Sequence, residues 1–255
     1  MKRMVLDQEL QALEAQVLQL GTLVENALAG ALEAFESGNQ DQAGAVVMGD
    51  TTIDDLHLAI EEHALRILTL QQPLGGRDLR FLSSVAPIAI DLERIGDEAE
   101  GIAQDVLRMI PYRQSGTPRA KGEPDLRASE DGEAAIMQSM LDLGNEVRTM
   151  LAQTMQAFAN RDAQAARSIW DEDKRIDQRH YIIQRDLLTM LEESHALPAL
   201  QHDPHRLQRT VYLLWIAHRL ERAADHCTNI CERIVFMVAC ETDIASSLWP
   251  GTSVL

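Results

Sequence analysis

Apolar residues recur every three or four positions along most of the chain, which is the pattern of helices that bury one face. Between residues 7 and 37 the apolar positions are Leu10, Leu13, Val17, Leu20, Val24, Leu28, Ala31 and Phe35. The same spacing holds over residues 42–71, where Ile53 and Ile60 belong to the apolar stripe, and over residues 78–110. Three long helices are therefore predicted before residue 111.

Residues that favour turns separate these stretches. Residues 37–39, Ser-Gly-Asn, are predicted to end the first helix, and Asp41 is predicted to cap the second. Residues 73–76, Pro-Leu-Gly-Gly, are predicted to end the second helix. Pro87 lies inside the third helix and should bend it unless that helix starts later.

The pattern of the first half returns in altered form in the second half. Residues 89–102 recur 128 positions later, so that the Leu-Glu-Arg of residues 92–94 is repeated at residues 220–222. Residues 18–35 recur 123 positions later, and residues 160–162, Asn-Arg-Asp, take the place of the first turn and its cap. A repeat of this length indicates two copies of one structural unit.

The predicted fold is all-α, with two antiparallel three-helix bundles related by the internal duplication. The first bundle is predicted over residues 1–110 and the second over residues 130–240. Residues 111–129 contain two glycines and several prolines without an apolar period, which indicates a linker. Residues 241–255 show no period and are predicted to form a C-terminal tail.

Composition and charge narrow the classes of function. Aromatic residues make up only 4% of the chain, which favours helices over sheets. The formal net charge of −17 argues against nucleic acid as a partner and against unaided adsorption to anionic lipid. Neither a membrane-spanning stretch nor a secretory signal is evident, and the three cysteines do not form a disulfide framework. We expect a cytoplasmic protein that reaches the membrane only through protein partners.

Pairs of acidic residues four positions apart occur at equivalent places in the two repeats. These pairs are Asp50/Asp54, Glu93/Asp97, Asp173/Asp177 and Glu221/Asp225. A fifth pair, Asp142/Glu146, has no equivalent. Like charges at this spacing repel by a few tenths of a kcal/mol on a helix. Either a basic side chain on a neighbouring helix or a hard cation with oxygen ligands could offset that repulsion.

In each repeat the second and third helices are consecutive and each carries one acid pair, so four carboxylates are expected to converge. His57 and His180 lie on the same faces as the pairs and also match between the repeats. Imidazole would add a nitrogen ligand suited to iron or zinc. A solvated acidic flank with two surface histidines explains the same spacing, and the sequence leaves both interpretations open.

Other candidate sites are weaker. Cys227 and Cys231 occupy the places of alanines in the first repeat and are predicted to be small core residues. His218 lies three positions before Glu221 and could either join a site or contact another helix. The only Glu-x-x-His pattern of the di-iron kind is Glu192/His195. No loop that would cradle a phosphate is evident, so we predict that the chain does not itself sense free phosphate.

Four short stretches carry a recognisable pattern: residues 70–73 (Leu-Gln-Gln-Pro), 78–80 (Asp-Leu-Arg), 92–97 (Leu-Glu-Arg-Ile-Gly-Asp) and 220–230. These stretches resemble the PhoU family of phosphate-uptake regulators. The resemblance implies a fold of two three-helix bundles and, as in some members, iron or zinc clusters held by the acid pairs. Residues 223–224 (Ala-Ala), residues 100–101 (Glu-Gly) and His57 depart from the family pattern.

For function, the resemblance implies a non-enzymatic negative regulator of phosphate-starvation signalling and of phosphate uptake. Such a protein would contact the ATPase subunit of the high-affinity phosphate ABC transporter and the phosphate-sensing histidine kinase, and it would form a homodimer as is common in the family. Two alternatives stay open: an accessory protein of a different phosphate permease, and a carboxylate-bridged metal oxidase.

Overall fold

The computed structural model describes residues 2–70, 73–112, 127–194, 203 and 205–239. These residues form long α-helices and one short 3₁₀ segment, and the described part contains no strand. The α-helices are α1 (Lys2–Ser37), α2 (Gln40–Leu70), α3 (Gly76–Met109), α4 (Arg127–Asn160), α5 (Ala163–Ser194) and α7 (Arg206–Ala239). The 3₁₀ segment is η1 (Ile110–Tyr112). The all-α prediction is confirmed.

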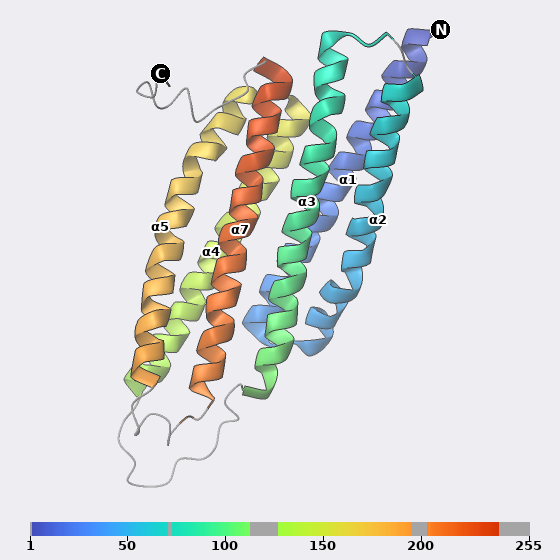
Figure 1. Ribbon diagram of the computed structural model, residues 1–255. Helices are drawn as coiled ribbons and strands as arrows, with labels where there is room; N and C mark the ends of the chain where they lie inside the picture. The colour runs from blue at the N-terminus through green and yellow to red at the C-terminus, as the bar shows by residue number, and fades with distance from the viewer. Residues whose placement is uncertain (1, 71–72, 113–126, 195–202, 204, 240–255) are drawn as a thin grey trace, which may run out of the picture.

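The helices form two three-helix bundles that lie side by side (Figure 1). One bundle contains α1, α2 and α3, and the other contains α4, α5 and α7. Helix α3 packs antiparallel against α7, and α1 packs against α4, so these four helices form the middle of the molecule. Helices α2 and α5 lie on the two outer flanks.

The apolar stripes predicted from the sequence form the buried core. Phe35 and its repeat equivalent Phe158 are both fully buried, as are Leu92 and its equivalent Leu220. Burial of each large apolar side chain contributes about 1.5–3 kcal/mol relative to exposure. The duplicated stripes therefore stabilise both bundles to a similar extent, because they bury equivalent apolar side chains in each.

The two turns between the first and second helices of each bundle are equivalent. Asn39 Oδ1 accepts hydrogen bonds from the backbone N–H groups of Asp41 (3.0 Å) and Gln42 (3.2 Å). The prediction that Asp41 caps α2 is thus wrong: Asn39 is the cap, because only a residue before the first turn can reach these free N–H groups. In the second bundle Asp162 Oδ1 accepts from Gln164 (3.0 Å) and Ala165 (2.9 Å), as predicted.

Helix ends differ from the sequence prediction by a few residues. Helix α1 begins at Lys2 rather than near Asp7, and α3 begins at Gly76 and continues through Pro87. Helix α4 begins at Arg127, while residues 113–126 of the predicted linker and the whole predicted tail lie outside the described residues. Helix ends carry little periodic signal, so differences of this size are ordinary.

Two glycines allow α1 and α4 to approach closely. A Cβ on Gly21 would collide with Met155, and a Cβ on Gly144 would collide with Leu32. Gly21 and Gly144 are repeat equivalents, and so are Leu32 and Met155. The interface between the bundles therefore contains the same small-against-large contact twice.

Gly144→Ala is expected to lower the free energy of unfolding by about 1 kcal/mol. Overpacking against the buried Leu32 costs about 1–3 kcal/mol, which exceeds the roughly 1 kcal/mol that alanine gains over glycine in a helix. Gly44→Ala in α2 is the matched control, because nothing lies within 4 Å of the Cβ it would add. It should stabilise the protein, and urea unfolding of both variants measures the difference. Equal stabilisation by both substitutions would contradict the close contact.

A row of ion pairs joins α3 to α7. Asp91 Oδ1 lies 2.9 Å from His226 Nδ1, and Glu98 Oε2 accepts from Arg219 Nη1 at 3.1 Å. Asp105 Oδ2 accepts from Arg219 Nε at 3.0 Å. Every carboxylate in this row belongs to α3 and every basic group belongs to α7.

The row also explains one departure from the family pattern. Arg219 crosses α3 at Gly101, where any Cβ would collide with its guanidinium. Arg222 adds a second ion pair to Glu98 at 3.1 Å, and Asn229 donates to Asp91 at 3.1 Å. Glycine at position 101 therefore makes room for the central arginine of the interface.

Candidate metal centre

Helices α2 and α3 bring three carboxylates together on the first bundle. Asp50 and Asp54 come from successive turns of α2 and Asp97 comes from α3, and one carboxylate oxygen of each lies within 4.8 Å of the other two. Glu93 lies one turn before Asp97 on α3, and its charge acts on Asp50. We call these residues the first carboxylate cluster.

The second bundle repeats this arrangement. Asp173 and Asp177 of α5 and Asp225 of α7 place carboxylate oxygens within 4.8 Å of one another. Glu221 lies one turn before Asp225, and its charge acts on Asp173. These residues are the second carboxylate cluster. The predicted convergence of the acid pairs is thus present in the structure for three carboxylates per bundle, with Glu93 and Glu221 beside them.

Small residues on the third helices let the second helices approach. A Cβ on Gly96 would lie 3.1 Å from the buried Ile53 side chain and 3.7 Å from Asp50 Oδ1. The equivalent residue in the second bundle is Ala224, which is buried. The small side chain beside each cluster therefore fixes how closely the acids of the two helices face one another.

In both clusters, burial and neighbouring acids raise the pKa values of carboxyl groups. Burial, together with Asp54, raises the pKa of Asp50 to about 6, and burial, together with Asp177, raises the pKa of Asp173 to about 6. Burial also raises the pKa values of Glu93 and Asp225. Each raised pKa means that the ionised form is disfavoured in the folded protein.

The described part of the protein only partly offsets the charge of these acids with hydrogen bonds and basic side chains. Asp50 Oδ1 and Asp173 Oδ1 are buried repeat equivalents, and neither has a hydrogen-bond partner in the described part of the chain. Arg94 lies 3.6 Å from Glu93 and 3.4 Å from Asp97, but its equivalent Arg222 turns away to Glu98 across the bundle interface. A buried polar atom without a partner costs free energy unless a ligand satisfies it.

The histidines lie at the edges of the clusters. His57 Nε2 is 3.5 Å from Glu61 Oε1 on the same helix, while its charge also acts on Glu93. Burial lowers the pKa of His180, whose ring centroid lies 6.5 Å from that of His218. The three-residue groupings that the structure brings within 4.8 Å contain neither histidine.

The model of the PhoU domain matches two stretches of the chain, residues 17–106 and 140–234. The chain belongs to the PhoU family. It is 31% identical over 231 residues to the phosphate-specific transport system accessory protein PhoU of Escherichia coli strain K12, covering 90% of this chain and 83% of that protein.

Two solved structures share the fold of this PhoU-family chain. The crystal structure of the phosphate transport system regulatory protein PhoU from Streptococcus pneumoniae matches with a TM-score of 0.75 and 29% identity, covering 93% of this chain and 99% of that one. The crystal structure of PhoU from Pseudomonas aeruginosa matches with a TM-score of 0.75 and 28% identity, over 92% and 99% of the two chains. Within the described residues, none of the helices is both long and apolar enough to cross a membrane.

In this PhoU-family chain the carboxylate donors of the clusters suit a hard divalent cation best, and iron and zinc also accept such oxygens. Carboxylate oxygens are the ligands that such cations accept, and Asp50 Oδ1 and Asp173 Oδ1 are buried oxygens in need of a partner. His57 and His180 lie outside the groups of three carboxylates, although His57 Nε2 is also a buried atom without a hydrogen-bond partner among the described residues.

One acid beside the first carboxylate cluster, Glu100, was missed by the sequence reasoning. The charge of Glu100 contributes to the raised pKa of Asp50, and its Oε1 accepts a hydrogen bond from Gln104 at 2.7 Å. Glu100 lies three positions after Asp97 and therefore on the same helix face, a spacing that would have identified it. The second cluster has Thr228 at this place, so the two clusters differ in charge.

Among the described residues, the weaker candidate sites of the sequence are buried in the core or engaged by neighbouring side chains. Cys227 and Cys231 are fully buried, and burial raises the pKa of Cys227 well above its usual value and that of Cys231 to about 12. Glu146 of the unmatched acid pair is bound by Arg179 at 2.5 Å. His218 Nδ1 lies 3.2 Å from Glu221 Oε2. His195, the partner of Glu192, lies outside the described residues.

Proposed function

We propose that this chain is an accessory protein of phosphate-specific transport that restrains phosphate uptake and the response to phosphate starvation. The observation that carries the proposal is that PhoU domains match both halves of the chain. The names of its relatives, a transport accessory protein and a transport regulatory protein, support the same role. The protein would act without enzymatic turnover.

The proposed partners are the ATPase subunit of the phosphate ABC transporter and the phosphate-sensing histidine kinase, at the cytoplasmic face of the membrane. The net charge of −17 supports a route through protein partners, because anionic lipid would repel the chain. Within this role, we propose that the two carboxylate clusters hold iron, zinc or another hard divalent cation. Bound metal would neutralise the crowded acids and brace the second helix of each bundle against the third.

A phosphate-starvation reporter, such as alkaline phosphatase, tests the regulatory role. In a strain that lacks this gene and grows in high phosphate, reporter activity is expected to be high, and a supplied copy of the gene should suppress it. The control is the same strain in low phosphate, where the reporter is induced with or without the gene. A silent reporter in the deletion strain at high phosphate would contradict the proposal.

A further inference from the structure

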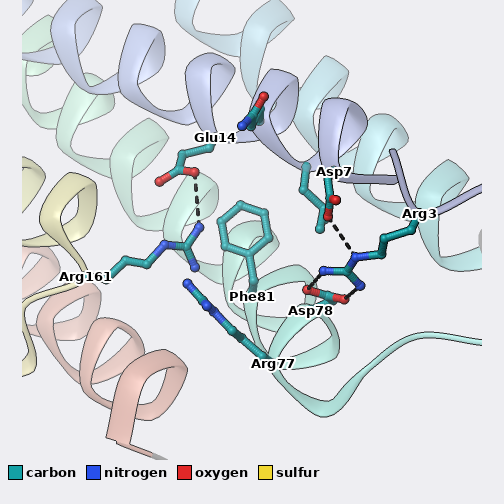
Figure 2. Close-up of a pocket in the computed structure, with 9 residues that line it drawn as sticks. Arg3, Asp7, Glu14, Arg77, Asp78, Phe81 and Arg161 are labelled. Carbon is teal, nitrogen blue, oxygen red and sulfur yellow. Dashed lines mark hydrogen bonds and ion pairs between the residues drawn. The ribbon is translucent and has the colours of Figure 1, made fainter. Parts of the chain in front are cut away.

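A pocket away from the carboxylate clusters is lined by three arginines from distant parts of the chain (Figure 2). Arg3 comes from the start of α1, Arg77 from the start of α3, and Arg161 from the turn between α4 and α5. These segments meet at one end of the molecule (Figure 1).

The arginines are not equally neutralised by the carboxylates around them. Arg3 is fully engaged, with Asp78 at 2.6 Å and Asp7 at 3.0 Å. Arg161 pairs with Glu14 at 3.1 Å. Arg77 is exposed and forms no ion pair with any described residue, and its guanidinium points toward that of Arg161 (Figure 2). Two cations thus face a shared space that contains one carboxylate partner, Glu14.

The backbone at Arg161 indicates that its side chain is needed where it lies. Its φ is 54°, in the left-handed region that costs an ordinary residue about 1–2 kcal/mol. The equivalent residue of the first bundle is Gly38, which adopts φ 68° without that cost. Retaining arginine at this strained position places its guanidinium 5.1 Å from the centroid of the buried Phe81 ring.

The equivalent place at the other end of the molecule is built differently. The repeat equivalent of Phe81 is Arg209, a buried residue whose guanidinium is held by Glu133 at 2.8 Å and by Asp203. There the protein supplies the anions itself. The end with Arg77 and Arg161 has as many carboxylates as arginines in its lining, but two of these carboxylates are engaged by Arg3, so Glu14 alone faces the other two guanidinium groups.

We propose that this pocket binds a phosphoryl oxyanion, either inorganic phosphate or the phosphate of a monoester. Guanidinium groups donate paired hydrogen bonds to phosphate oxygens, and donors that approach from α3 and from the α4–α5 turn can reach different oxygens of one tetrahedral anion. The start of α3, where Gly75 offers no side-chain cap, adds free N–H groups and a favourable dipole.

The proposal changes the sequence-based expectation about phosphate. No contiguous segment could reveal the pocket, because its three arginines lie in three separate segments. Asp7, Asp78 and Glu14 line the same pocket and repel an anion, so we expect affinity in the millimolar range. The pocket would respond to abundant phosphate and ignore traces of it.

Calorimetric titration of the purified, metal-loaded protein with inorganic phosphate and, separately, with O-phosphoserine tests the proposal. At least one probe should bind, and the double variant Arg77→Gln with Arg161→Gln should bind it at least roughly tenfold more weakly. Arg66→Gln is the matched control: this exposed arginine on α2 lies outside the pocket and should leave binding unchanged.

Two further results decide the source and the place of binding. Preference for one probe identifies whether free phosphate or a monoester is the ligand. The double variant Asp50→Asn with Asp173→Asn, which alters the carboxylate clusters, should keep the binding, which excludes phosphate held by bound metal. Failure of both probes to bind, or binding that survives loss of both arginines, would overturn the proposal. Neither of these two outcomes would contradict the proposed regulatory role, which the starvation reporter tests separately.

Discussion

Replacing Asp50 and Asp173 together by asparagine is expected to raise the melting temperature of the metal-free protein at neutral pH and to lower the metal that the protein retains. Both carboxylates are partly buried, each has an oxygen without a partner in the described structure, and each faces further acids. Asparagine keeps the shape and removes the charge. After allowance for solvent screening, relief of about 1 kcal/mol per site would raise the melting temperature by roughly 5 °C.

The pH dependence follows from the raised pKa values of about 6. The folded protein binds the Asp50 and Asp173 protons more tightly than the unfolded chain does, whose aspartates titrate near 3.8. These two groups therefore stabilise the metal-free fold below about pH 4, and this stabilisation is lost as the pH rises through about 6. The double variant should lack that loss.

Thermal melts of the metal-free protein in a chelating buffer between about pH 4 and pH 7 measure its stability. Mass spectrometry of the purified protein without chelator measures the metal that it retains. Asp142→Asn is the matched control, since Asp142 is exposed and accepts a hydrogen bond from Gln138 at 2.9 Å. It should change neither stability nor metal content. Unchanged metal content in the Asp50/Asp173 variant would mean that the clusters are only solvated acidic flanks.

Replacing Arg209 by methionine is expected to lower the free energy of unfolding by about 3 kcal/mol. The Arg209 side chain is 5% exposed and binds Glu133 through two nitrogens, each at 2.8 Å, as well as Asp203 and the carbonyl oxygen of Tyr112. Methionine fills a similar volume but removes the guanidinium that two largely buried carboxylates bind. Denaturant unfolding monitored by circular dichroism measures the loss.

A double-mutant cycle with Glu133→Gln separates the ion pair from simple packing. If the pair carries the effect, the loss caused by Arg209→Met should shrink when Glu133 is already neutral. Arg175→Met on the exposed face of α5 is the control and should change stability by no more than about 0.5 kcal/mol. Equal losses of unfolding free energy in the Arg209→Met and Arg175→Met variants would show that the buried ion pairs add no more stability than an exposed one.

Much of the fold was predictable because it depends on local periodicity. The apolar stripes gave the helices, the turn residues gave most of the breaks, and the duplication gave two bundles. The acid pairs of the two carboxylate clusters could also be predicted, since residues four apart share a helix face and consecutive helices are neighbours. The same rule also places Glu100 on the face of Asp97, although the sequence-based prediction did not include it.

The features that the sequence did not reveal depend on how the two bundles are placed against each other. Nothing in the spacing of Asp91 and His226 indicates that they meet, because they come from different repeats. Gly101 departs from the family pattern, and the physical reason, the guanidinium of Arg219 that crosses it, comes from a helix of the other repeat. The pocket of Arg3, Arg77 and Arg161 likewise exists only after three remote segments come together.

The separation of charges across the interface makes the two halves of this protein non-interchangeable. A back-to-back pair of α3 helices would set Asp91, Glu98 and Asp105 against the same acids, and a pair of α7 helices would oppose arginine with arginine. Each half therefore recognises the other and rejects its own copy. Separated from its partner, either half would expose a row of like charges without counter-charges, so the same residues that join the bundles also set the register in which α3 meets α7.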